Sequence, residues 1–104
     1  MQVMVNSDNH IHGSAALAEK VRGRVQLKLQ RFEDQLTRVE LHFNDENSHK
    51  GGGLDKRCQA EARIKGRDPV SVSHNGDNLE QALEGAIAKL GTVLERNLEK
   101  QRPH

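Results

Sequence analysis

Apolar positions along the chain follow two different periods, which alternate from segment to segment. Residues 2–6 have the character of a short strand, and residues 37–43, 56–65 and 69–74 alternate polar and apolar side chains, as half-buried strands do. Between residues 14 and 36, and again from residue 77 to Pro103, apolar side chains recur every three or four positions, as on one face of a helix. The pattern therefore predicts the order β-α-β-β-β-α.

Both predicted helices carry signals at their ends. Ser14 is a suitable N-cap for the first helix, because its hydroxyl can accept a hydrogen bond from an amide of the first turn. The acidic pair Glu33 and Asp34 marks the end of that helix. Asp77 is expected to cap the second helix, with Glu80 three residues later as the reciprocal partner of a capping box.

Each alternating strand places its apolar side chains on one face of the sheet. The residues expected to face inward are Val39, Leu41, Phe43, Cys58, Ala60, Ala62, Ile64, Val70 and Val72. Since each helix offers one apolar stripe, both helices should cover that face, giving a two-layer α+β sandwich with a four-stranded sheet. We expect residues 1–104 to form a single domain, with a flexible loop at 44–55 and a flexible tail at 101–104.

Composition excludes several classes of protein. The chain has no apolar run of about 18 residues and no charged-then-apolar start, so we expect neither a transmembrane helix nor a secretory signal. Its single cysteine, Cys58, cannot form an internal disulfide, which favours a reducing, cytoplasmic location. Phe32 and Phe43 are its only aromatic residues, so stacking platforms for nucleic-acid bases are not expected.

The charge is unevenly distributed along the chain. The net charge is only +1, from 16 basic and 15 acidic side chains, yet residues 20–31 contain five cations and no acid. Helical spacing aligns two rows of cations beside the apolar stripes, Lys20, Arg24, Lys28 and Arg31 on the first helix and Lys89, Arg96 and Lys100 on the second. If the helices pack side by side, these rows could form one basic surface that contacts RNA phosphates. The alternative is two ordinary solvated helix faces.

A second group of cations lies on or near the predicted strands. The outer sheet face should present Arg57, Arg63 and Lys65 beside Arg38 and His42, with Lys56 at the start of the strand. These side chains could form a second contact with RNA or a protein surface, and cross-strand pairing with Glu40 and Glu61 explains them equally well. Gly51-Gly52-Gly53 lacks the spacing of a nucleotide-binding loop, so we interpret it as a hairpin tip, with ordering on a bound RNA as the alternative.

The second predicted helix also carries three short motifs, Ala82-Leu83-Glu84, Ala88-Lys89-Leu90 and Leu94-Glu95-Arg96. With the element order, they resemble the ribosome hibernation-promoting factor family, also called ribosome-associated inhibitor A or sigma-54 modulation protein, in its short form. The resemblance implies a stationary-phase or stress-response factor that binds rRNA of the small ribosomal subunit in the mRNA/tRNA channel and inhibits translation. It also implies a monomer off the ribosome, and Lys89 and Arg96 fit the family pattern best.

The residue pattern gives little support for a metal site or for a catalytic site. Neither His10 and His12 nor His49, which lies near acidic residues, has the spacing of a zinc site, so we expect no metal and no cofactor. Cys58 belongs to an inward-facing set and is expected to be a buried structural residue rather than a nucleophile. We therefore expect no enzyme and no small-molecule substrate. The alternative function is a protein-binding regulatory module with a non-ribosomal partner, using loop 44–55 and the mixed sheet face.

Overall fold

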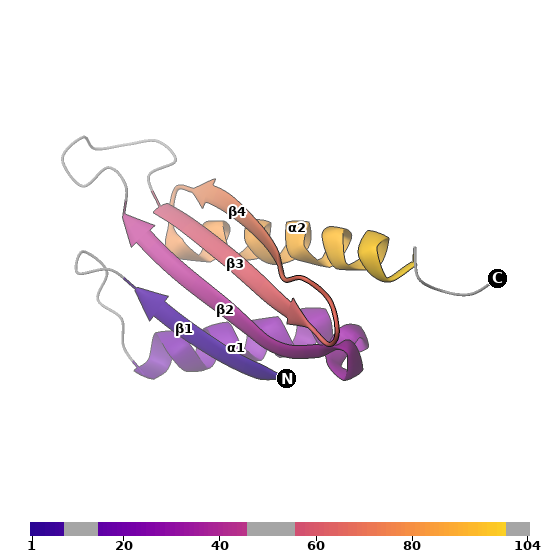
Figure 1. Ribbon diagram of the computed structural model, residues 1–104. Helices are drawn as coiled ribbons and strands as arrows, with labels where there is room; N and C mark the ends of the chain where they lie inside the picture. Colours follow the sequence, from indigo (N-terminus) through magenta and orange to yellow (C-terminus); the bar gives the residue numbers. More distant parts are fainter. Residues whose placement is uncertain (8–14, 46–55, 100–104) are drawn as a thin grey trace.

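The computed structural model describes residues 1–7, 15–45 and 56–99. Its strands are β1 (Gln2–Ser7), β2 (Leu36–Asp45), β3 (Lys56–Ile64) and β4 (Val70–Gly76), and its helices are α1 (Ala15–Leu29), the 3₁₀ helix η1 (Gln30–Gln35) and α2 (Leu79–Glu99). The strands form one sheet in the order β1-β2-β3-β4, with β1 parallel to β2 and the other neighbours antiparallel. Both long helices cover the same face of the sheet (Figure 1). This arrangement confirms the predicted fold class.

Two of the predicted segments are only partly described. Strand β2 extends to Asp45, so Asn44 and Asp45 belong to the sheet and not to the predicted loop. The rest of that loop, residues 46–55, lies outside the described residues, as do the predicted cap Ser14 and the tail at 101–104.

The first helix ends earlier than the apolar spacing predicts. Helix α1 ends at Leu29 and the chain continues as η1. Phe32 is buried within η1, and Leu36 is buried as the first residue of β2. The tighter 3₁₀ turn keeps Phe32 on the core side while the chain reverses. The three-to-four spacing therefore continues across two changes of backbone conformation, and Arg31 lies in η1.

Helix α2 is capped by Asn78, one residue later than predicted. The backbone N–H of Gln81 donates to Asn78 Oδ1 at 2.8 Å, and the backbone N–H of Asp77 donates to Gln81 Oε1 at 3.1 Å. The expected pair, Asp77 and Glu80, is therefore wrong, although both pairs have suitable chemistry. Strand β4 continues to Gly76, where an added Cβ would lie only 2.7 Å from a backbone nitrogen of α2, so the helix begins directly against the strand.

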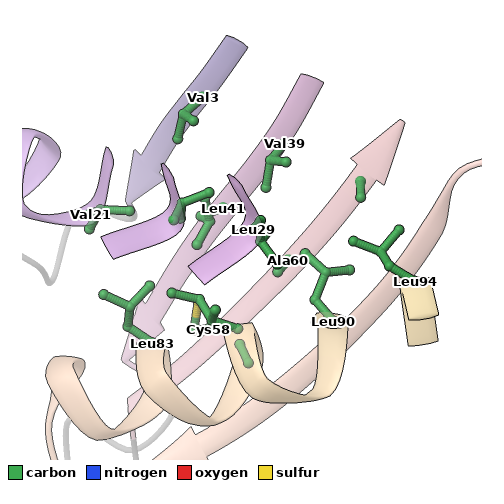
Figure 2. Packing of buried hydrophobic residues seen from close by; sticks show 14 of the residues in the cluster. Val3, Val21, Leu29, Val39, Leu41, Cys58, Ala60, Leu83, Leu90 and Leu94 are labelled. Carbon is green, nitrogen blue, oxygen red and sulfur yellow. The ribbon is translucent and has the colours of Figure 1, made fainter. Parts of the chain in front are cut away.

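The hydrophobic core fills the space between the sheet and the two helices. Every residue expected to face inward on β2 and β3 is buried, whereas the two valines of β4 are half-buried. Cys58, Ala60 and Ala62 of β3 are fully buried, and their small size lets α2 approach the sheet closely. Figure 2 shows Leu83 and Leu90 of α2 pointing toward these strands.

Cys58 is a structural residue, as predicted. Its side chain is fully buried in the core, and burial raises the pKa of the thiol to about 12. Since only the thiolate is a nucleophile, the group is unreactive at neutral pH.

Both outer edges of the sheet are contacted by a basic side chain of the neighbouring helix. Arg22 Nε of α1 donates to the Val3 carbonyl of β1 at 3.4 Å, and Lys89 Nζ of α2 donates to the Ser73 carbonyl of β4 at 2.9 Å. Basic side chains at strand edges oppose pairing with other chains. Lys89 therefore has a structural contact as well as its predicted role toward RNA.

Candidate nucleic-acid interface

Helices α1 and α2 run parallel along the sheet, and their facing sides carry opposite charges. Lys20 Nζ lies 3.1 Å from a carboxylate oxygen of Glu80, near the start of both helices. At the other end, Arg31 of η1 lies 3.6 Å from Glu95. In each of these two pairs more than half of each side chain is exposed, so each contributes little to stability.

The central ion pair is the most complete one. Arg24 Nε and Nη2 donate to the two carboxylate oxygens of Glu84 at 2.7 and 2.8 Å, in the bidentate geometry that suits a guanidinium. The hydrogen bond from Arg24, together with its positive charge, lowers the pKa of the Glu84 carboxyl, and Lys28 and Lys20 add to that effect. The same hydrogen bond raises the pKa of Arg24. Glu84 is therefore ionised at neutral pH.

The acidic row of α2 is the feature that sequence reasoning missed. Glu80, Glu84 and Glu95 are separated by four and eleven residues, which are close to one and three helical turns, so they share one flank of α2. That spacing was visible in the sequence and identifies the flank. It does not show that this flank faces α1.

The two predicted basic rows lie on opposite sides of α2. The flank of α2 that faces α1 is acidic, and Lys89 reaches in the other direction, to the edge of β4. Arg96 follows Lys89 by two turns and is exposed, and Lys100 lies outside the described residues. Packing the helices side by side therefore does not merge the rows into one continuous basic surface, because the carboxylates of α2 lie between them.

A shallow groove runs between α1 and α2 beside the central ion pair. It has a volume of about 220 Å³, and two small residues of α2, Ala88 and Gly91, contribute to its lining. Lys28 and Arg31 contribute cations to it from the α1 side. Within the described residues Lys28 forms no ion pair and no hydrogen bond, although it lies close enough to Glu84 to affect that carboxyl. Lys28 is thus the cation of this row that is most available to a phosphate.

The outer face of the sheet is electrically balanced around four residues. Arg38 lies opposite Arg63, and Glu40 lies opposite Glu61, in the register of β2 and β3. The ion pairs form along each strand, at 3.1 Å between Arg38 and Glu40 and 3.6 Å between Arg63 and Glu61. The expected pairing with Glu40 and Glu61 is present, but it runs within strands rather than across them. These ion pairs offset the repulsion between the like charges that lie opposite each other on the two strands.

The remaining cations of this second group are dispersed. Lys56 lies on the helix side of the sheet and forms an ion pair of 3.3 Å with its register partner Asp45. Arg57 lies on the outer face, opposite Asn44, and Lys65 follows β3 as an exposed residue. The structure does not gather Lys56, Arg57, Arg63 and Lys65 into one patch.

No group of three or more metal-ligating side chains is found within the described ranges. His10, His12 and His49, the histidines considered as ligands, lie outside those ranges. None of the helices described is long and apolar enough to cross a membrane.

The central ion pair between Arg24 and Glu84 should make the stability of the fold depend on pH. Because the pKa of Glu84 is lower in the folded than in the unfolded protein, the pair stabilises the fold at neutral pH. That contribution is lost as the pH falls below the ordinary glutamate value toward the folded-state value. We expect Glu84→Gln to lower the thermal midpoint slightly at pH 7, and we expect its difference from the wild type to shrink as the pH falls below the ordinary glutamate value.

Thermal unfolding between pH 7 and pH 3 measures this difference. The variant Glu19→Gln makes the same change on an exposed residue of α1 that has no ion pair in the part of the chain described, so it should follow the wild type throughout. A gap between wild type and Glu84→Gln that stays constant across this range would contradict the assignment.

The sequence and the fold of this chain are similar to those of known proteins. The model of the family described as Sigma 54 modulation protein / S30EA ribosomal protein matches residues 4–102. A ribosomal subunit interface protein from Coxiella burnetii has the same fold, with a TM-score of 0.70 and 19% identity over 95% of this chain and 99% of that one. The N-terminal domain of Protein Y from Thermus thermophilus gives a TM-score of 0.73 and 18% identity over 92% and 98%. No curated protein matches the sequence.

Proposed function

Because the chain belongs to the Sigma 54 modulation protein / S30EA ribosomal protein family, we propose that it is a ribosome-associated factor that keeps translation idle. It binds rRNA of the small subunit in the channel that mRNA and tRNA otherwise occupy, and it inhibits translation by steric occlusion. It acts in the cytoplasm during stationary phase or stress, and it is a monomer off the ribosome. The description of one structural relative as a ribosomal subunit interface protein supports this proposal.

The observation that carries the proposal is the basic flank of α1 and η1. This flank consists of Lys20, Arg24, Lys28 and Arg31, and the side chains of Lys20 and Arg31 are more than half exposed. A row of cations on a preformed helix suits contacts to phosphates, which supply affinity with little sequence readout. Structured RNA is recognised largely through shape and backbone, which fits a chain with only two aromatic residues.

Further cations extend the proposed contact on either side of this flank. Lys89 and Arg96 lie on the opposite side of α2. With Lys100, which is outside the described residues, they are proposed as a second row that would meet a different stretch of rRNA. Lys56, Arg57, Arg63 and Lys65 are proposed as secondary contacts. Their carboxylate partners, where present, make them weaker candidates than Lys28.

Sucrose-gradient fractionation of a stationary-phase lysate tests the proposal. The protein should sediment with particles that contain the small subunit and should remain with small subunits after the ribosomes are dissociated at low magnesium. Recovery only at the top of the gradient, bound to another protein, would instead support a regulatory module with a non-ribosomal partner. The outer sheet face, with paired charges of both signs, is the surface that such a partner would use.

A further inference from the structure

The acidic row of α2, Glu80, Glu84 and Glu95, occupies the contacts that RNA phosphates would need on the opposite helix. It pairs with three of the four cations of the α1 flank at 3.1, 2.7 and 3.6 Å. Carboxylate and phosphate oxygens match the same guanidinium geometry, so the two anions compete for one set of donors. A phosphate can bind Arg24 in this bidentate manner only after Glu84 has been displaced.

We propose that the acidic row of α2 determines the RNA specificity of this surface, by masking the α1 cations against any polyanion that cannot displace several carboxylates at once. The proposal rests on the proposed function, since it concerns the same RNA-binding flank. The favoured ligand is a folded RNA with several phosphates held at the spacing of Lys20, Arg24 and Arg31. A flexible single strand is the disfavoured one.

The physical reason is the difference between intramolecular and intermolecular anions. Each carboxylate is tethered beside its cation at a high effective concentration. A single phosphate from solution that displaces the carboxylate therefore gains no net binding free energy. A rigid RNA surface makes several exchanges in one binding event and gains additional contacts, with the unpaired Lys28 among them. The near-neutral net charge of +1 acts in the same direction, because it weakens non-specific attraction to polyanions.

The variant Glu80→Gln/Glu84→Gln/Glu95→Gln tests the proposal with purified protein. Glutamine keeps the side-chain length and a hydrogen-bond acceptor but removes the charge that holds each cation. We expect the triple variant to bind unstructured oligouridine at least threefold more tightly than the wild type at moderate salt. The slope of log K against log salt should steepen by about 0.7 for each cation released, or about 2 in total.

Glu84→Gln is also measured alone, and its matched control is Glu19→Gln, which makes the same change in net charge on α1 without releasing a cation. The control should leave oligouridine binding close to that of the wild type. Where the triple variant is poorly folded by thermal unfolding, Glu84→Gln carries the test, with an expected steepening of about 0.7. Binding of the wild type to purified small subunits is measured in parallel, so that the proposed function is judged separately.

Each outcome has a distinct meaning. Tighter oligouridine binding by the glutamine variants, with an unchanged control, supports the masking role. Unchanged oligouridine binding by well-folded variants overturns it, even when the wild type binds small subunits normally. A gain for Glu19→Gln equal to that for Glu84→Gln also overturns it, because bulk charge would then be the cause. Failure of the wild type to bind small subunits overturns the proposed function, whereas the oligouridine comparison still decides whether the carboxylates mask the cations.

Discussion

Reversal of Lys28 and Lys89 to glutamate should abolish co-sedimentation of the protein with small ribosomal subunits. Lys28 borders the groove between α1 and α2, and Lys89 lies on the opposite flank of α2. Placing a carboxylate against rRNA phosphates costs several kcal/mol, so we expect the affinity to fall by roughly a hundredfold or more for Lys28→Glu/Lys89→Glu. Pelleting of purified small subunits with increasing amounts of each variant measures this loss.

The fold should survive both reversals. Lys28 has no ion pair or hydrogen bond in the part of the chain described, and the contact of Lys89 Nζ with the Ser73 carbonyl is exposed. The matched control for each single reversal is Arg22→Glu, which makes the same charge change on the side of α1 where Arg22 contacts the edge of β1. It should bind small subunits within a few-fold of the wild type.

The single reversals distinguish the two basic rows. Because α2 separates Lys28 from Lys89, each variant reports on one row only. A larger loss for Lys28→Glu would place the α1 flank at the centre of the contact, as proposed. Undiminished binding of the double variant at moderate salt would exclude both rows as the rRNA-binding surface.

Replacement of Gly85 by alanine should destabilise the fold by about 1–3 kcal/mol, the usual range for overpacking a core. A Cβ at Gly85 would overlap the imidazole ring of His74, which packs from β4 against this turn of α2. His74 lies opposite the buried Cys58 in the sheet register, so its half-buried ring lies on the helix side of the sheet and must move to admit the methyl group. The penalty should exceed the gain of about 1 kcal/mol that alanine brings to a helix.

The same substitution at Gly23 provides the comparison. Gly23 lies in α1, with no atom within 4 Å of an added Cβ and no positive φ angle. Gly23→Ala should therefore stabilise the protein by up to about 1 kcal/mol. Urea unfolding of both variants measures the difference directly. Equal stability of Gly85→Ala and the wild type would show that the His74 ring is not packed against α2 as described.

Much of the fold could be predicted from the sequence, because strand alternation and helix periodicity report burial directly. The inward set on β3, Cys58, Ala60 and Ala62, follows from alternation alone. The end of α1 could not be predicted in this way, because Phe32 and Leu36 stay buried after the backbone has left the α-helix. The pair that caps α2 could not be predicted either, because Asp77 with Glu80 and Asn78 with Gln81 have equally suitable side chains.

The candidate site was predictable in composition but not in arrangement. Lys20, Arg24 and Arg31 lie along the flank that faces α2, as their spacing indicated, and Lys28 borders the groove between the helices. The rotation of α2 about its axis depends on how its apolar stripe packs on the sheet, which no local pattern specifies. That rotation directs Glu84 toward Arg24 and Lys89 toward β4, and it determines which cations are masked.

The central claim is that the basic flank of α1 and η1 contacts small-subunit rRNA in the mRNA/tRNA channel. A cleavage probe tethered to the protein tests this claim most directly, since it locates each face of the protein relative to rRNA. Cys58 is buried and unreactive, so a single added cysteine can be labelled selectively. Thr92→Cys places an iron chelate in the groove beside Lys28, and Gln59→Cys places it on the outer face of the sheet. Predominant cleavage of small-subunit rRNA in the mRNA/tRNA channel from Thr92→Cys is the predicted result. Cleavage from Gln59→Cys alone, or only of large-subunit rRNA, would contradict the account.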